Sequence, residues 1–401
     1  MARVLEHHAL ELFGRGGIAV PPFRVAATPG EAAGATRDLG GASIVKALIP
    51  AGGRGKAGAI RRADSPEQAA AIAHELLGRT VLHFPVERVL VSAPVAIEQE
   101  LFVAITFDSM SRSPIVLFSA LGGIEIEQIL ARDPDQLVQR EVVIGQGLPP
   151  FVAREIAEAA GLRGRTLVEV GSALAALYRL FRRVDAQTVE VNPLAITPEG
   201  KVVAPSGVIV LDDQAAFRHP ELEGMADPEL TNGWRPFTPL ERRLREIDRT
   251  DPGSAIRFNE FEDGDVAFMV TGGGAGLLAF DAILRAGGRP ATTFDITPGR
   301  VEEKMYLATM AILSRPGLKG LIAGGNISNF IPIDVKVRGV MRALKELGID
   351  PATFPVVFRF DGPAGEAAKD LTAALPGIEY LDGRSSIEDA VRRIVERTAA
   401  P

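Results

Sequence analysis

The second half of the chain alternates short apolar runs with longer amphipathic stretches. The apolar runs have the length of strands, and the amphipathic stretches have the 3.6-residue period of helices. The predicted strands cover residues 265–270, 291–296, 318–325, 354–360 and 378–381, and the predicted helices cover residues 277–287, 301–314, 333–348, 364–375 and 386–400. This alternation is typical of a parallel sheet covered by helices on both faces. We therefore predict an α/β, flavodoxin-like or Rossmann-like doubly wound domain over residues 263–401.

Glycine-rich turns follow two of these predicted strands, at Thr271–Gly274 and at Gly324–Asn326. Ligands of doubly wound sheets bind beyond the carboxyl ends of the strands. A helix that starts directly after Gly325 would point backbone N–H groups at an anion. The alternative interpretation is a pair of ordinary strand-to-helix turns. For the last helix, Ser385 and Glu388 have the spacing of a capping box.

The first half contains the stretch AGGRGKAG at residues 51–58, between predicted strands at 42–50 and 58–63. The next helix is predicted only at 65–78, so the glycines do not open a helix as a dinucleotide fingerprint requires. A P-loop needs Ser or Thr after its lysine, but Ala57 follows Lys56. A glycine hairpin that folds over a triphosphate remains, with Lys46 holding phosphates. A glycine-rich surface hairpin is the alternative.

A second candidate element is VEVNPL, residues 189–194, which we interpret as a strand entering a turn. Glu190 and Asn192 are two residues apart and therefore lie on one face of that strand. Their side-chain oxygens suit Mg²⁺. An ordinary Asn-Pro turn after a strand is the alternative interpretation.

Residues 219–262 are rich in proline and charge, so we expect a connector between a domain at 1–218 and the one at 263–401. A length of 401 residues agrees with two or three domains. The net charge of −7 argues against nucleic-acid or anionic membrane partners. The absence of cysteine excludes disulfides, thiolate metal sites and cysteine nucleophiles. With no apolar run long enough to span a membrane, we expect a cytoplasmic protein.

Five segments, in order and spacing, resemble the β subunit of the succinyl-CoA synthetase family: VKALIPAGGRGKAG, LVSAPVAIEQELFVAI, LGGIEIEQI, VEVNPLAIT and FRHPEL. This resemblance implies an ATP-grasp domain followed by a flavodoxin-like CoA-ligase domain. It also implies that ATP drives the joining of a carboxylate to CoA through an acyl phosphate and a phosphohistidine. In the family, that histidine and most of the CoA site belong to a separate α subunit. None of this chain's five histidines lies beside a glycine turn of the second domain. This agrees with a phosphorylated histidine on a separate subunit.

The resemblance also implies roles for individual residues. The nucleotide-binding positions are Lys46, Gly53, Arg54, Gly55 and Glu100, the metal position is Asn192, and Glu190 is expected near the phosphohistidine. Ser206 stands where the family has an acidic metal ligand, and Val208 stands where it has a lysine. Ser92 replaces a hinge acid. These departures weaken the expected Mg²⁺ site, for which Asp212 and Asp213 are nearby substitutes in the sequence.

The second domain has a long segment, GGNISNFIPIDVKVRG, that looks more like the citrate-binding part of ATP-citrate lyase or citryl-CoA synthetase. The expected substrate-binding residues are Thr271, Gly272, Gly273, Gly325, Asn326, Ile327, Ser328 and Arg359. The citrate-type pattern has two successive arginines, whereas Phe360 follows Arg359 here. An ion pair with Asp361 is the alternative role for Arg359.

These features favour the β subunit of an ADP-forming carboxylate–CoA ligase acting on succinate, malate or citrate. Its expected cofactors are ATP/ADP, weakly held Mg²⁺ and CoA, and its expected partner is an α subunit in a heterodimer or heterotetramer. The alternative is a regulatory or carboxylate-binding subunit that has lost full Mg-ATP chemistry. A third possibility is a carboxylate ligase that is active without an α chain.

Overall fold

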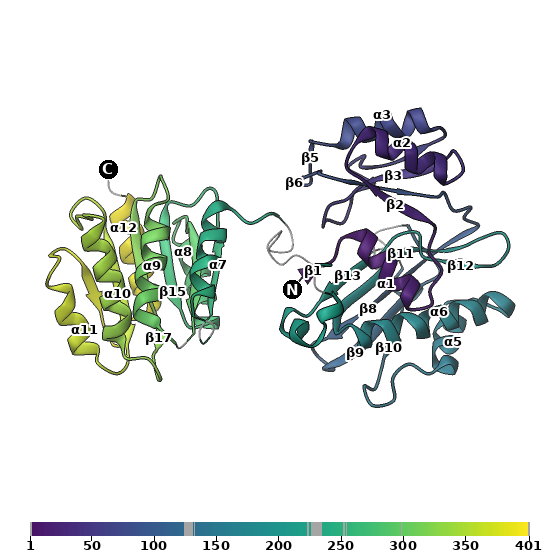
Figure 1. The fold of residues 1–401 in the computed structure, drawn as a ribbon. Helices are drawn as coiled ribbons and strands as arrows, with labels where there is room; N and C mark the ends of the chain where they lie inside the picture. Colours follow the sequence, from purple (N-terminus) through teal and green to yellow (C-terminus); the bar gives the residue numbers. More distant parts are fainter. Residues whose placement is uncertain are drawn as a thin grey trace. The chain divides into compact units, whose positions relative to one another are not determined.

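The computed structural model describes residues 2–123, 131, 133–222, 224–225, 235–251, 253, 255–297 and 299–399. The chain forms two compact units, Met1–Pro236 and Phe237–Pro401. Figure 1 shows each unit as its own arrangement of sheets and helices. None of the helices in the described part of the chain is long and apolar enough to cross a membrane.

The smaller sheet of the first unit has the strand order β2 (Phe23–Ala26), β7 (Val89–Ser92), β3 (Ser43–Ala47) and β4 (Ile60–Ala63), and neighbouring strands are antiparallel. Helices α2 (Pro29–Asp38) and α3 (Pro66–Leu76) pack against it around a core rich in alanine and valine (Figure 1). Thr28 and Ser65 cap these two helices by accepting backbone hydrogen bonds. The predicted β3, β4 and α3 are confirmed.

The larger sheet of the first unit is also antiparallel. Its strands, in spatial order, are β1 (Ala2–Arg3), β13 (Val208–Leu211), β11 (Ala186–Ile196), β8 (Gln99–Asp108), β9 (Ser113–Ser119) and β10 (Val138–Glu141), and β12 (Val202–Val203) pairs with β11. Helices α1 (Glu6–Arg15), α5 (Pro150–Ala159) and α6 (Gly164–Arg183) share its hydrophobic core. Phe13, Phe118 and Phe181 are buried in this core.

The VEVNPL segment differs from its prediction, because β11 does not end in a turn at the Asn-Pro pair. The strand continues to Ile196, and the Asn192–Pro193 peptide bond is cis. Its register against β8 shifts between Val191 and Leu194. Proline has no backbone N–H to donate to a neighbouring strand. The shift of register at this point allows β11 to continue past Pro193.

The second unit has a parallel sheet in the order β15 (Val266–Thr271), β17 (Gly320–Ile327), β18 (Val356–Asp361) and β19 (Glu379–Leu381). Helices α8 (Gly274–Arg285) and α12 (Ile387–Ala399) share one hydrophobic cluster with the sheet, and α9 (Val301–Leu313), α10 (Ile333–Glu346) and α11 (Gly365–Thr372) share another. The helices therefore cover both faces (Figure 1), which confirms the doubly wound prediction. Strand β16 (Thr292–Ile296) contacts β15 but pairs antiparallel with β14 (Ile256–Glu260), a strand that was not predicted.

The expected connector at 219–262 is partly folded, and the boundary between the units lies at 236/237. Residues 223, 226–234, 252 and 254 of the connector lie outside the described residues, as do residues 124–129 of the LGGIEIEQI segment. Helix α7 (Pro239–Arg249) and β14 both belong to the second unit, where Leu244 joins the core. The helix escaped prediction because its apolar stripe is narrow and it follows a proline-rich stretch.

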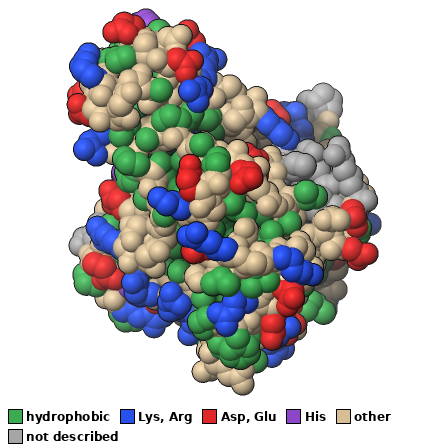
Figure 2. Space-filling model, turned by 90° about the vertical axis from the view of Figure 1, so that its right-hand side faces the viewer, with side chains coloured by type: hydrophobic (Ala, Val, Ile, Leu, Met, Phe, Trp, Pro, Cys, Tyr) green, Lys and Arg blue, Asp and Glu red, His purple; other side chains and the backbone are tan. Residues whose placement is uncertain are grey.

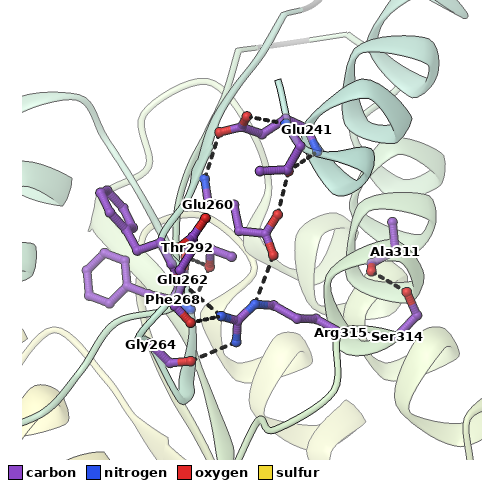
Figure 3. A network of polar contacts seen from close by, with 11 residues as sticks. Glu241, Glu260, Glu262, Gly264, Phe268, Thr292, Ala311, Ser314 and Arg315 are labelled. Carbon is purple, nitrogen blue, oxygen red and sulfur yellow. Dashed lines mark hydrogen bonds and ion pairs between the residues drawn. The ribbon is translucent and has the colours of Figure 1, made fainter. Parts of the chain in front are cut away.

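A polar network fixes α7 to the second unit (Figure 3). Thr238 and Glu241 form a capping box, and Glu241 Oε1 accepts a hydrogen bond of 3.0 Å from the backbone N–H of Glu260. The Glu260 carboxylate accepts from Thr238 Oγ1 at 2.5 Å and from Arg315 Nε at 2.9 Å. Arg315 also donates to the carbonyls of Phe261, Glu262 and Gly264. One arginine thus joins α7, β14 and the residues after α9.

Two predicted helix starts lie at different residues. No helix begins after Gly325, because β17 extends to Ile327 and α10 begins at Ile333. In the last helix the reciprocal capping bonds join Ser386 and Asp389, rather than Ser385 and Glu388. The carbonyl of Ser385 instead accepts a hydrogen bond from Arg359.

Candidate functional site

Lys46 and Arg54 meet at one buried carboxylate, Glu6 of α1. Lys46 Nζ lies 2.8 Å from Glu6 Oε1, and Arg54 Nη2 lies 2.5 Å from Glu6 Oε2. The three side chains are at most 8% exposed. Burial alone would raise the pKa of Glu6, but the charges of Arg54 and Lys46 outweigh it and hold that pKa below its usual value. Sequence reasoning missed Glu6, because nothing in the chain's order pairs residue 6 with residues 46 and 54.

The glycine stretch forms a compact turn between β3 and β4, not a helix start. Backbone bonds from Ala57 to Gly53 and from Gly58 to Gly55 close it. Gly53 has a φ of +72°, a conformation that side chains disfavour, whereas Gly55 does not have a positive φ. Arg54 also donates to the Ala47 carbonyl at 3.1 Å, so its guanidinium is held against β3.

Asn192 and Glu100 both lie against the Gly122–Gly123 backbone. The backbone N–H of Gly123 donates to Asn192 Oδ1 at 2.8 Å. A side chain at Gly122 would collide with the Leu101 backbone, and one at Gly123 would collide with the Glu100 carboxylate. The structure therefore brings together two predicted site residues that are 92 positions apart. The glycines permit this close approach.

Ser206 joins the Lys46 cluster to Asn192. Ser206 Oγ donates to the Asn192 carbonyl at 3.4 Å, while the adjacent Pro205 carbonyl accepts from Lys46 Nζ at 2.8 Å. Val208 pairs with Glu190 across β13 and β11. Ser92 is buried at the end of β7 and pairs with Ile44 of β3.

Arg3 is a further cation of this region that sequence reasoning missed. Burial and then the nearby charge of Arg54 lower the pKa of Arg3, while the charge of Glu190 opposes them. A Cβ added at Gly52 would lie 3.8 Å from Arg3 Nη2, so this guanidinium reaches the glycine turn. Three basic side chains from β1, β3 and the turn therefore gather near two carboxylates.

The residues that the structure describes do not by themselves form a magnesium site. The described residues contain no group of three or more His, Asp or Glu side chains placed to hold a metal ion. Asn192 Oδ1 is occupied by the Gly123 N–H, and Ser206 offers a neutral hydroxyl. Asp212 caps the 3₁₀ turn Asp213–Arg218 at the opposite end of β13 from Ser206, so it does not replace the missing acid. The side chain of Asp213 is outside the described residues.

In the second unit the predicted substrate residues converge where β15 and β17 end. Thr271 and Gly325 are paired in register, and a Cβ at Gly325 would lie 2.7 Å from Thr271 Oγ1. A Cβ at Gly272 would lie 3.3 Å from that of Asn326. Helix α8 starts at Gly274 with no side-chain cap, so its first N–H groups are not bound by a capping side chain. Gly272–Gly274, Asn326 and Ile327 are exposed.

Arg359 and Ser328 play structural roles in the described residues. Arg359 is 9% exposed and donates to the carbonyls of Gly325, at 2.9 Å, and Ser385, at 3.1 Å. Ser328 Oγ donates to the Ile331 carbonyl at 2.7 Å, and its N–H donates to the Asp361 carbonyl at 2.8 Å. Among the described residues, neither carboxylate oxygen of Asp361 forms an ion pair with Arg359, contrary to the alternative considered above.

The surface charges form no large area of one sign on the face drawn in Figure 2. There, Lys and Arg side chains alternate with Asp and Glu side chains. A broad basic surface is what nucleic-acid binding would need. The basic side chains of Lys46 and Arg54, by contrast, are buried.

Comparisons with known proteins agree with the division of the chain into two units. Residues 3–196 match the ATP-grasp domain family, and residues 235–353 match the citrate-binding family of ATP citrate lyase. The β subunit of an ADP-forming succinate–CoA ligase from Rubrobacter xylanophilus is 37% identical over 395 residues, which cover 98% of this chain and 97% of the relative. The β subunit of a GDP-forming succinate–CoA ligase from Thermus thermophilus is 35% identical over 378 residues, covering 94% of each chain.

A solved structure has the same fold over nearly the whole chain. It is ATP citrate lyase from Methanothrix soehngenii in complex with citrate and coenzyme A, with a TM-score of 0.77 at 20% identity, covering 98% of this chain and 99% of that one. At this identity the likeness concerns the fold alone. The full-length similarity to the two β subunits is what establishes the family. This chain belongs to the β-subunit family of the succinate–CoA ligases, which are acid–thiol ligases.

Proposed function

We propose that this chain is the nucleotide-binding subunit of an ADP-forming carboxylate–CoA ligase that works with an α-type, CoA-binding partner. The observation that carries the proposal is the convergence of Lys46 and Arg54 on one buried point. A cationic pair of this kind suits the phosphates of a nucleotide, because phosphoryl transfer depends mainly on positioning and charge neutralisation. Glu6 holds the two cations in place until phosphate arrives.

In this proposal the nucleotide lies against Lys46, the Gly53–Gly55 turn, Glu100 and Asn192. Magnesium enters as part of Mg-ATP, since the protein donors here are only an amide and a hydroxyl. The phosphate passes to a histidine of the partner, with Glu190 near the transfer point. At the second unit, the uncapped start of α8 and the neutral donor Asn326 bind the acid.

The test is reconstitution of the full chain with an α-type, CoA-binding subunit. ATP or GTP, CoA and one of succinate, malate or citrate are supplied, and acyl-CoA and nucleoside diphosphate are measured. We expect acyl-CoA in proportion to nucleoside diphosphate, and none without the partner. Product formation by this chain alone would instead support a stand-alone ligase.

A second candidate function is a regulatory or carboxylate-binding subunit. It is favoured by Ser206 and by the lack of a group of three acidic or histidine metal ligands among the described residues. Titration of ATP with and without Mg²⁺ separates the two. A ligase subunit binds Mg-ATP more tightly than free ATP. A silenced subunit binds the acid without that Mg²⁺ dependence.

Within the ligase, Asn326→Ala is expected to reduce a preference for the hydroxylated acids malate and citrate, because it removes a neutral donor.

A further inference from the structure

Lys336 of α10 is a buried cation that the function described so far does not use. It is 7% exposed. Among the described residues its Nζ has one hydrogen-bonding contact, at 3.5 Å, to Thr271 Oγ1 at the end of β15. No carboxylate of those residues lies within ion-pair distance, although the charge of Asp295 acts on it from farther away. The ammonium group therefore keeps most of its hydrogen-bonding capacity.

A second buried lysine of the same unit shows what a structural role requires. Lys304 is 1% exposed, and its Nζ has acceptors at 2.9–3.0 Å: the carbonyls of Asp248 and Asp251 and the carboxylate of Asp248. It ties α9 to the end of α7. Lys336 makes no comparable set of bonds, so a structural role does not account for its burial.

The position of Lys336 coincides with the candidate acid site. Thr271 is followed by the exposed Gly272–Gly274 and the uncapped start of α8. Asp295, whose charge acts on Lys336, uses Oδ1 to accept hydrogen bonds from two backbone N–H groups, those of Gly272 and Ile296, both at 3.0 Å. Arg359, the cation expected at this site, is instead bound to the Gly325 and Ser385 carbonyls.

We propose that Lys336 is the specificity-determining cation of this site, and that it binds a carboxylate of the substrate that is not converted to the thioester. The inference rests on the proposed function. A ligase removes the charge from the carboxylate it activates, whereas a second carboxylate stays charged throughout the reaction. A fixed cation that binds this second group selects di- and tricarboxylic acids over monocarboxylic acids.

The energetics of burial agree with a binding role. Burial lowers the pKa of Lys336, and the charge of Asp295 opposes that effect only in part. An ammonium group held in this way is less well solvated than in water, so it destabilises the ligand-free protein. A ligand carboxylate supplies the missing partner. Replacement of the lysine by an apolar side chain should therefore not reduce stability.

The experiment is a calorimetric titration of the full chain with succinate, butyrate, citrate and inorganic phosphate. The variants are Lys336→Met, Lys336→Arg and the control Lys345→Met, which removes an exposed lysine from the same helix. We expect the wild type and the control to bind succinate about tenfold or more tightly than butyrate. Lys336→Met should abolish this difference without lowering the melting temperature, and Lys336→Arg should restore part of it.

Several outcomes would overturn the inference. These are a succinate-to-butyrate ratio unchanged in Lys336→Met, no carboxylate binding by the wild type, or phosphate as the only anion that Lys336 affects. A melting temperature that falls in Lys336→Met together with lost binding of every ligand would assign the lysine a structural role. The proposed function is tested separately. If the wild type reconstituted with its partner makes no acyl-CoA, the proposed function is wrong, whatever the titrations show.

Discussion

At the scale of single residues, the first unit depends on a carboxylate that lies far from its partners in sequence. Glu6 forms ion pairs with both Lys46 and Arg54 inside the protein, where an unpaired charge would be strongly unfavourable. Removal of the lysine should therefore affect stability as well as phosphate binding, although its charge was expected to face only phosphate. The two roles of Lys46 can be separated by substituting all three charged residues.

Lys46→Met should abolish ATP binding and also destabilise the first unit by about 2 kcal/mol, because Glu6 loses one of its two cations. The triple variant Glu6→Gln/Lys46→Met/Arg54→Met removes all three buried charges and should recover most of that stability without recovering ATP binding. Urea unfolding and ATP titration measure the two effects. ATP binding by the triple variant would show that neither Lys46 nor Arg54 is a phosphate ligand.

Ser206→Asp restores an acid beside Asn192. An added carboxylate should tighten Mg-ATP binding by charge alone, with little change for ATP in the presence of a chelator. Asp212→Asn is the matched control, because Asp212 lies at the far end of β13 and should leave the affinity for Mg-ATP unchanged. If Ser206→Asp binds Mg-ATP no better than the wild type does, the metal ion lies elsewhere.

At the scale of elements, two polar clusters fasten segments that carry few apolar residues. In the second unit, Arg315 connects α7 and β14 through Glu260 and three carbonyls (Figure 3). In the first unit, His219 contacts Asp185 at 2.6 Å and Glu221 at 3.0 Å, which fixes the segment after β13 to the start of β11. Both clusters include residues of the segment 219–262, which was expected to be a connector: Glu260 in one and His219 in the other.

Arg315→Met should destabilise the second unit by roughly 3 kcal/mol, since it removes the ion pair between Arg315 and Glu260 and the hydrogen bonds to three carbonyls. Arg243→Met is the control: its partner Glu246 is exposed, so the loss should stay within about 0.5 kcal/mol. The measurement is urea unfolding followed by circular dichroism. Equal losses in the two variants would mean that the network does not hold α7.

His219 should make the stability of the first unit depend on pH. The hydrogen bond to Asp185 raises the pKa of His219, against the effect of burial. The stabilisation is therefore fully present below the unfolded-state pKa, about 6.5, and is lost as the pH rises through the higher folded-state pKa. Urea midpoints of the first unit between about pH 6 and 9 should fall more in the wild type than in His219→Gln. His74→Gln, which alters an exposed histidine of α3, should behave like the wild type.

At the scale of the whole molecule, each unit has its own hydrophobic cores. The first unit contains one core under the large sheet and another beside the small sheet, and the second unit has one core on each face of its parallel sheet. Units with separate cores are expected to fold separately. Their ligands should then stabilise them separately as well.

Scanning calorimetry of the full chain should show two transitions. ATP should raise the midpoint temperature of only one transition, which should also appear in a fragment of residues 1–236. A dicarboxylate should raise the midpoint temperature of only the other transition, which should also appear in a fragment of residues 237–401. A fragment that shows no cooperative transition, or one ligand that shifts both transitions equally, would contradict independent units.

Local patterns in the sequence determined the doubly wound sheet of the second unit and the strand–glycine turn–strand element at residues 43–63. Apolar periodicity and glycine positions act over a few residues, so they can be recognised without the fold. The order of the motifs also placed Lys46, Asn192 and Ser206 in one region. Helix α7 was not predicted, because charged residues dominate it and the residues that hold it, among them those of β14 and Lys304 of α9, are distant in the sequence.

The tertiary structure alone decided which charges are neutralised and which remain available. Glu6 belongs to α1, which packs in the core of the large sheet, yet its carboxylate meets Lys46 of the small sheet. Arg359 is occupied because Gly325 of β17 and Ser385 present carbonyls to it. Lys336 occupies one position in an amphipathic helix, and its sequence neighbours do not distinguish it from an exposed lysine. Its burial beside Thr271 depends on how α10 packs on the sheet, a long-range arrangement that the hydrophobic pattern permits but does not specify.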